Sequence, residues 1–229
     1  MKNWKNVILG ICAVGLLFVC WRSIVDTQEF DAKVVERENV VKKRLMHIKS
    51  AEEAYKSQHE EYCGDWNVLI AFVKDGKLPI VMKQGVLTEE QMDKGLTESK
   101  AAAIVNSGDQ AAIAANGLEG FRRDTVWVSL LDSLNKEFDD FCPDSLRYIP
   151  FSQGDTFEII ACPNTTRSGS IIQVMECNAP DSSFLKGMGK AGSRLIYNRN
   201  EEANAKGAYP GLKIGDAGNN WNNNAGNWE

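Results

Sequence analysis

A glycine-rich segment, GMGKAG, is the first candidate for chemistry in this sequence. Gly187, Gly189 and Gly192 match the spacing of a dinucleotide-binding turn, which must follow a strand and open a helix. The preceding residues, DSSFLK, do not resemble a strand, and Ser193 looks like the start of the next helix. A phosphate-binding loop is excluded because Gly189-Lys190 is followed by alanine instead of serine or threonine. We therefore expect no nucleotide cofactor.

The histidines are the second candidate, because zinc sites are built from histidine and cysteine. His47 and His59 lie twelve residues apart in a helical region, and no C-x-x-C spacing accompanies them. His59-Glu60-Glu61 lacks the second histidine of a zinc protease helix. We expect both histidines to face solvent and the sequence to contain no zinc site.

Acidic and hydroxyl residues offer no convergent catalytic set. Asp139, Asp140 and Asp144 could bind calcium as a loose cluster, but turn capping around Pro143 is the favoured interpretation. Asn164-Thr165-Thr166 is an N-glycosylation acceptor triplet of a kind that occurs often by chance. No nucleophile elbow is present. We expect no catalytic, cofactor-binding or metal-binding residues.

Four cysteines lie in the body of the chain, and two more lie in the apolar N-terminal run. Cys63, Cys142, Cys162 and Cys177 could form two disulfides in three possible pairings, or stay free as small buried hydrophobes. On a hairpin centred near Arg167, Cys162 and Cys177 would not face each other. Both interpretations stay open.

The N-terminal apolar run predicts a membrane span. Fifteen residues from Val7 to Trp21 carry no polar side chain, and Ile24 and Val25 extend the run. Nineteen helical positions span about 28 Å, close to the hydrocarbon core of a bilayer. A cleaved signal peptide and a soluble apolar helix are the alternatives, but no small-x-small cleavage site follows. We expect an uncleaved signal anchor that contacts membrane lipid through residues 7–25.

Charge placement predicts the orientation of this anchor. Lys2, Lys5 and Arg22 are the charged residues of the first 25, whereas the remaining chain has 23 basic and 31 acidic residues, a net charge of −8 against −5 for the whole. The positive-inside tendency places the N-terminus in the cytoplasm and the larger part in the periplasm, at a bacterial inner membrane. The acidic body argues against a nucleic-acid partner and against attraction to an anionic lipid surface.

A seven-residue repeat of apolar residues follows the span. Its members are Val34, Val41, Ile48 and Tyr55, with Leu45 as a second position. Such a stripe is usually an intramolecular core face, and a coiled-coil contact with a second copy or a protein partner is the sharper hypothesis. Because no proline or glycine occurs between Arg22 and Cys63, one helix could run from the membrane to Gly64.

The remaining sequence predicts an α+β domain with a small antiparallel sheet. Helices are expected over residues 66–74 and 193–206, with short helices that start at the Thr88 capping box and break at Gly95 and Gly108. Strands are expected at residues 125–130, 145–151, 156–162 and 171–177. The predicted regions are 1–25 (cytoplasmic stub and anchor), 26–63 (helical stem), 64–215 (exported α+β domain) and 216–229 (tail rich in Asn and Trp). Trp221 and Trp228 suggest that the tail docks onto the sheet.

The order of these signals resembles a family of uncharacterised single-span membrane proteins of Bacteroidota. The resemblance rests on AEEAYKSQHEEYCGDWNVLIAFVKDGKLPIV, RRDTVWVSLLDSL, DSLRYIPF, YPGLKIG and NNNAGNWE, and it brings no activity with it. A weaker resemblance is to type IV pilins and pseudopilins, which share an embedded N-terminal helix whose extension carries a segment like Ala51 to Tyr62, followed by a sheet. A prepilin processing site and a glutamate five residues into the apolar run are both missing.

Two functions from different classes follow. The first is a non-enzymatic envelope component, a scaffold or assembly protein that presents a periplasmic domain to protein partners or to a second copy through the stem. The alternative is a membrane-tethered enzyme or ligand-binding domain, which requires a deep pocket with convergent polar groups.

Overall fold

The chain begins with one uninterrupted α-helix, α1 (Lys2–His59), in the computed structural model, which describes residues 2–166, 168–218 and 224–229. Its side chains from Ile8 to Glu29 are exposed, and burial begins at Val34. The helix ends before the predicted stop at Gly64, because Glu60 adopts the left-handed conformation (φ 63°) that ends an α-helix. Helix α2 (Trp66–Asp75) follows, and the Asp65 side chain caps it by accepting from the amides of Asn67 and Val68.

The structure is α+β, as predicted, but the chain folds into two compact units. The first unit combines residues 1–70 with 141–229, and the second unit contains residues 71–140. The predicted boundaries treat residues 64–215 as one exported domain and residues 26–63 as a separate stem. They differ from the observed units because the second half of α1 is part of the core of the first unit.

The first unit contains an antiparallel sheet of three strands in the order β3 (Glu158–Thr165), β4 (Ile171–Pro180) and β5 (Gly211–Gly215). Cys162 lies opposite Val174 and Cys177 opposite Ile159, so the two cysteines do not face each other, as the hairpin geometry predicts. The predicted strand over 145–151 is wrong. That stretch holds the end of a 3₁₀ turn, η1 (Pro143–Ser145), and a single bridge between Tyr148 and Thr156.

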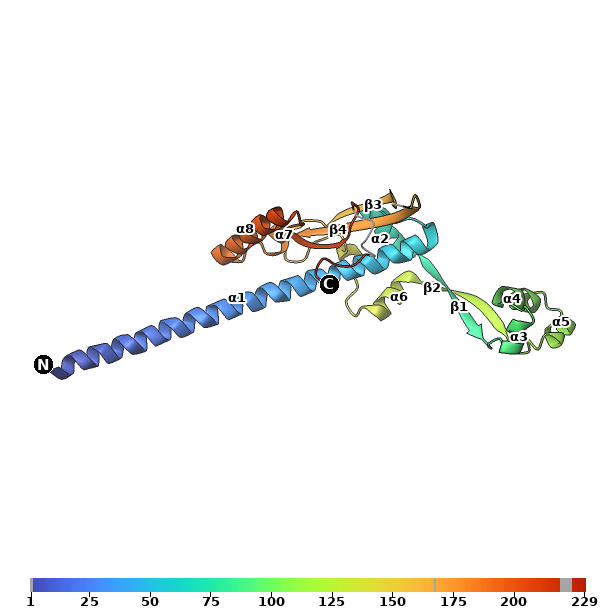
Figure 1. Cartoon of the computed structure of the whole chain (residues 1–229), viewed down its shortest axis with the longest axis horizontal. Coiled ribbons are helices and arrows are strands. Elements are labelled where there is room, and N and C mark those ends of the chain that lie inside the picture. Colours follow the sequence, from blue (N-terminus) through green and yellow to red (C-terminus); the bar gives the residue numbers. More distant parts are fainter. Residues whose placement is uncertain (1, 167, 219–223) are drawn as a thin grey trace. The chain divides into compact units, whose positions relative to one another are not determined.

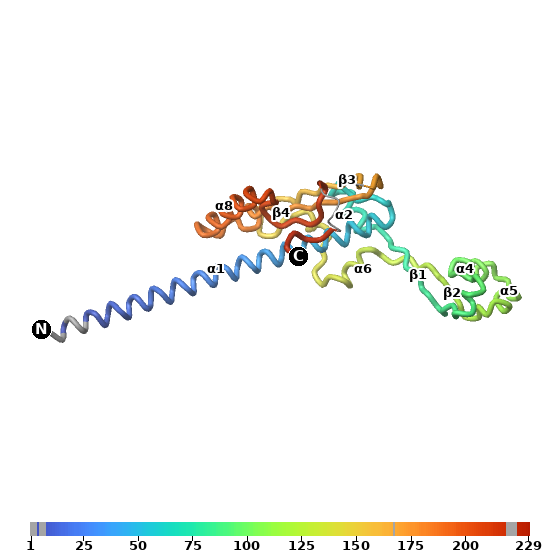
Figure 2. The backbone as a smooth tube through the Cα atoms, in the orientation of Figure 1, coloured from blue at the N-terminus to red at the C-terminus, as the bar shows by residue number. Residues whose placement is uncertain are grey.

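Two helices and the C-terminal residues complete the first unit. Helix α7 (Asp181–Phe184) leads into α8 (Gly189–Lys206), which starts four residues before the predicted Ser193. Residues 224–229 dock beside β5, where the Asn227 amide donates to the Lys213 carbonyl at 3.0 Å, so the C-terminus lies next to α1 (Figures 1 and 2). The Trp221 part of the predicted tail lies outside the described residues.

The core of the first unit lies between α1 and the C-terminal half of the chain. Helix α1 packs against β5 and α7. The largest fully buried apolar side chains there are Leu45, Ile48, Leu69, Leu146, Phe157, Met175, Phe184, Leu185 and Ile214.

The second unit is built on a two-stranded antiparallel ribbon. Its elements are β1 (Lys77–Gln84), α3 (Glu89–Asp93), α4 (Glu98–Asn106), α5 (Gln110–Ala115), β2 (Arg122–Ser129) and α6 (Leu130–Glu137). The capping box of Thr88 and Gln91 and the breaks at Gly95 and Gly108 are confirmed. A small core of Leu87, Ala101, Leu118 and Phe121 holds α4 and α5 in place.

Candidate interaction site

The apolar stripe of α1 is the site that the sequence predicted, and the structure places it inside the first unit. Val34, Val41, Leu45 and Ile48 are at most 5% exposed. Tyr55 is half-buried, with its ring stacked on that of His59 at 4.1 Å between centroids. The four aliphatic residues therefore form an intramolecular core face, because a second chain cannot reach them without opening the core.

His47 corrects one expectation about this helix. Its side chain is 2% exposed and lies 5.4 Å from the Phe141 ring, whereas the sequence placed it in solvent. The reason is that the C-terminal half of the chain covers a wider part of α1 than the heptad stripe indicates. His59, near the end of α1, is exposed as expected.

An ion-pair network joins α1, α7 and α8. The Arg199 guanidinium lies 2.8 Å from a Glu38 carboxylate oxygen and 3.5 Å from a carboxylate oxygen of Asp181. The Asp181 side chain is nearly buried, and its desolvation raises the pKa of that carboxyl in spite of the Arg199 charge. Glu38 also lies 4.0 Å from the Lys42 ammonium, so Arg199 is shared between two acids, and the network fixes the two helices to α1.

A cavity of about 340 Å³ opens over this network, and its other walls come from the C-terminal part of the chain. Trp228 lines it and lies 5.8 Å from the Lys42 ammonium, a cation–π contact. Tyr209 also lines it, and burial raises the pKa of its phenol to about 12, with smaller contributions from nearby acids such as Glu158. The charged side chains that line this cavity form ion pairs with one another. Such an arrangement is more typical of a structural contact between helices than of a catalytic centre.

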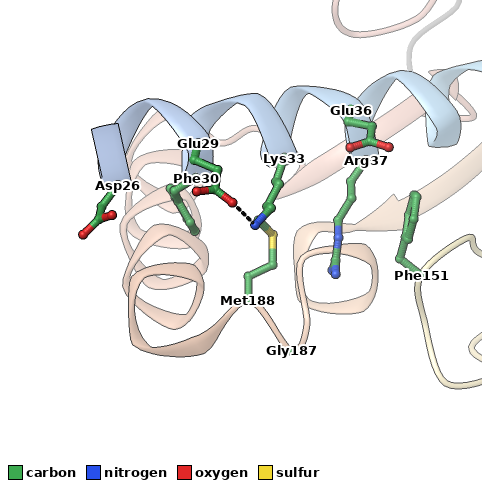
Figure 3. A pocket seen from close by; sticks show the side chains of 9 residues that line it. All are labelled: Asp26, Glu29, Phe30, Lys33, Glu36, Arg37, Phe151, Gly187 and Met188. Carbon is green, nitrogen blue, oxygen red and sulfur yellow. Dashed lines mark hydrogen bonds and ion pairs between the residues drawn. The ribbon is translucent and has the colours of Figure 1, made fainter. Parts of the chain in front are cut away.

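A second cavity, of about 610 Å³, lies between α1 and the loop that connects α7 to α8 (Figure 3). Arg37 donates from Nη1 to the carbonyls of Phe184 and Lys186 at 2.9 Å each, and its guanidinium lies 5.0 Å from the centre of the Phe151 ring. Figure 3 shows the Arg37 side chain extending from α1 toward this loop, beside Phe151. Arg37 therefore ties the loop to α1.

Glu52 is the most unusual titratable group of the first unit, because it is a fully buried acid. Its Oε2 accepts a hydrogen bond from the Cys63 amide at 2.7 Å, and Oε1 has no hydrogen-bond partner in the part of the chain that the structure describes. Burial raises the pKa of Glu52 to about 8, and the Cys63 amide opposes that shift. Burial also raises the pKa of the Cys63 and Cys177 thiols, with a further contribution from the Glu52 charge.

The motifs that suggested chemistry do not form a catalytic or metal-binding set in the described chain. Gly187 and Gly189 follow a helix, α7, rather than a strand. The Asn164 side chain donates to the Ala217 carbonyl at 3.1 Å and is half-buried. All six cysteines are free thiols in the structure, with Cys142 exposed. Within the described ranges, no group of three or more His, Cys, Asp or Glu side chains is placed to hold a metal ion.

Sequence reasoning did not identify the buried acid or the arginine contacts described above, and only the buried acid had a signal in the sequence. Glu52 lies four positions after Ile48 and seven after Leu45 along the helix, so the stripe itself indicated that Glu52 is buried. Arg37, Asp181 and Arg199 gave no comparable signal, because their partners are far away in the sequence.

The second unit contributes an exposed apolar surface of its own. Ile80, Val81, Val126 and Trp127 lie on the β1–β2 ribbon and are between 42% and 61% exposed. Ile80 pairs with Val126 and Val81 with Thr125, so apolar groups occur on both faces of the ribbon. In the described chain each of these strands has one paired edge only.

Helix α1 is, among the described residues, the one helix long and apolar enough to cross a membrane, and none of its apolar segment is covered by the rest of the chain. Comparisons of the chain with protein-family models, with curated proteins and with solved structures find no match in any of the three.

Proposed function

We propose that this chain is a non-enzymatic, single-pass envelope protein that anchors an α+β domain to a bacterial inner membrane and presents it to a protein partner. One observation carries the proposal: the apolar segment of α1 between Ile8 and Val25 is exposed on all sides, although one face of the same helix is buried from Val34 onward. A soluble fold would cover such a segment, and a bilayer provides the missing apolar surroundings.

The orientation that we propose has the N-terminus in the cytoplasm and the domain in the periplasm. Lys2 and Lys5 precede the apolar segment, whereas Asp26, Glu29 and Asp31 follow it. The two resemblances noted in the sequence, to single-span proteins of Bacteroidota and to pilins, agree with this arrangement, and the pilin resemblance covers the shape alone because the processing site is missing.

We infer that the partner binds the β1–β2 ribbon of the second unit. A two-stranded ribbon with apolar residues on both faces is marginally stable in water and gains from a covering surface. Its open edges can each accept an extended segment of another chain. Pro79 removes one backbone donor from β1, so β2, which contains no proline, is the better edge.

Site-specific photocrosslinking in native membranes tests this proposal. A crosslinker at Trp127 of the full chain is expected to give one discrete crosslinked species, and Val126→Asp in the same chain is expected to abolish it. The matched control is a crosslinker at Glu201, an exposed position on α8. Equal crosslinking from both positions would count against the ribbon, and release of the full chain from membranes by alkaline carbonate would count against the anchor.

A further inference from the structure

The loop between α7 and α8 reaches the level at which α1 enters the proposed membrane. Ala191, in the first turn of α8, lines a cavity of about 550 Å³ together with Phe18, Val19 and Arg22. Met188 lines the neighbouring cavity with Phe30 (Figure 3). The same cavity extends along α1 from Phe18, inside the apolar segment, to Phe30, beyond its end. The start of α8 therefore lies beside the C-terminal end of that segment, close to the lipid headgroups.

This part of the chain has a local charge opposite to that of the domain. Lys186, Lys190 and Arg194 are exposed, and none of the three has an ion pair in the described structure. No acidic residue occurs from Ser182 to Asn200. We call these three residues the cationic turn. From the net charge of −8 we expected that the body would not be attracted to anionic lipid, and the local positive charge of the cationic turn differs from that average.

The acidic residues of α1 that line the two cavities do not neutralise the cationic turn. Asp26 lies 3.7 Å from the Arg22 guanidinium, and Glu29 lies 2.7 Å from the Lys33 ammonium, so each acid has a cation on its own helix. Glu36 lies about 16 Å along the helix from Val25, and Lys186 lies at the same level, because its carbonyl accepts from Arg37. These two opposite charges are therefore the farthest from the headgroups, and Lys190, next to Ala191, is the nearest cation of the turn. The charge that the turn presents at the membrane surface is therefore positive.

We propose that the cationic turn binds the phosphate groups of anionic phospholipid headgroups at the surface of the membrane that α1 crosses. Ammonium and guanidinium groups donate charge-assisted hydrogen bonds to phosphate oxygens, and basic residues next to a span are attracted to an anionic leaflet. The half-exposed Met188 lies between Lys186 and Lys190 and supplies an apolar group that can enter the interface. This inference rests on the proposed anchor, and it fixes the first unit against the lipid surface.

Hydrogen–deuterium exchange of the full chain in nanodiscs tests the inference. One set of discs contains phosphatidylcholine and the other contains phosphatidylcholine mixed with phosphatidylglycerol. Exchange of residues 186–194 is expected to slow on the order of tenfold in the anionic discs and to recover in high salt. Residues 109–115, in the second unit, serve as an internal reference and are expected to exchange equally in both.

Charge variants make the test specific. The triple variant Lys186→Gln, Lys190→Gln, Arg194→Gln is expected to lose the lipid-dependent protection. The control triple Lys94→Gln, Arg122→Gln, Lys136→Gln removes the same charge from exposed positions of the second unit and is expected to keep it. Retained protection in the first triple, or its loss in the control, would overturn the inference.

The remaining outcomes separate this inference from the anchor. Equal exchange of the unmodified chain in both kinds of disc overturns the inference and leaves the anchor intact. Equal protection in phosphatidylcholine discs on adding inorganic phosphate would show a free anion site and overturn the lipid assignment. A chain that does not enter discs at all overturns the anchor and the inference with it.

Discussion

Arg199 on α8 and Glu38 on α1 form an ion pair, with 2.8 Å between the guanidinium and the carboxylate oxygen. The same guanidinium faces the nearly buried Asp181 at the start of α7. Helix α1 thus meets α7 and α8, which lie far from it in the sequence, at one arginine. The pairing explains how the C-terminal half of the chain is held along α1.

Arg199→Met is expected to destabilise the first unit by about 1–3 kcal/mol. The cost of removing one partner of a buried pair is about 3–5 kcal/mol, and the partial exposure of Arg199 reduces it. Chemical unfolding of the full chain in detergent measures the change. Lys206→Met breaks an exposed ion pair with Glu202 on the same helix and is expected to leave the unfolding curve unchanged. Equal effects of the two variants would contradict the assigned role of Arg199.

Glu52→Gln is expected to change how stability depends on pH. The folded-state pKa of Glu52, about 8, lies above its ordinary value of 4.5, so the folded chain holds this proton more tightly than the unfolded chain does. Glu52 therefore makes the free energy of unfolding fall between pH 4.5 and 8, by at most about 1.4 kcal/mol per pH unit.

The glutamine variant keeps an oxygen for the Cys63 amide and removes that fall, so the two unfolding curves should diverge as pH rises through this window. Glu53→Gln changes the adjacent, exposed glutamate and should follow the unmodified chain. Parallel pH profiles for the unmodified chain and Glu52→Gln would show that Glu52 titrates as an exposed acid does.

Leu45→Ala is expected to reduce the free energy of unfolding of the first unit by about 2–5 kcal/mol, because it leaves a cavity at a fully buried position. Val35→Ala, on the same helix but 54% exposed, is expected to change it by less than about 0.5 kcal/mol. Urea unfolding of the full chain in detergent compares them. If Leu45→Ala instead changed the oligomeric state alone, the stripe would be an intermolecular contact.

Thiol labelling is expected to report both the fold and the orientation. A membrane-impermeant maleimide should modify the exposed Cys142 in intact cells whose outer membrane has been permeabilised. Cys63 and Cys177 should react only after unfolding, because burial hides them and raises the pKa of both thiols. Cys142→Ser removes the rapid signal. Labelling of Cys142 only after disruption of the inner membrane would reverse the proposed orientation.

The local features of the fold were accessible from the sequence. The Thr88 capping box, the helix breaks at Gly95 and Gly108 and the cap at Asp65 depend on residues within three positions of one another, so short-range geometry determines them. Residues 211–215 show the limit of this reasoning. They form strand β5 because β4 and residues 224–227 pair with them, and their five residues alone carry too little pattern to predict a strand.

The sequence by itself determined the apolar segment of residues 7–25, the charge difference across it and the seven-residue stripe of α1. Only the tertiary structure decided what covers that stripe and where local charges lie. Val41 and Leu45 are buried because the chain returns to α1 after residue 140. The start of α8 lies beside the end of the apolar segment because the chain returns to α1 there, and α8 then follows α1 in the same direction as far as Glu38. The periodicity of apolar residues shows which face of a helix is buried. It does not show what buries that face, because the hydrophobic effect is non-directional and any apolar surface can cover it.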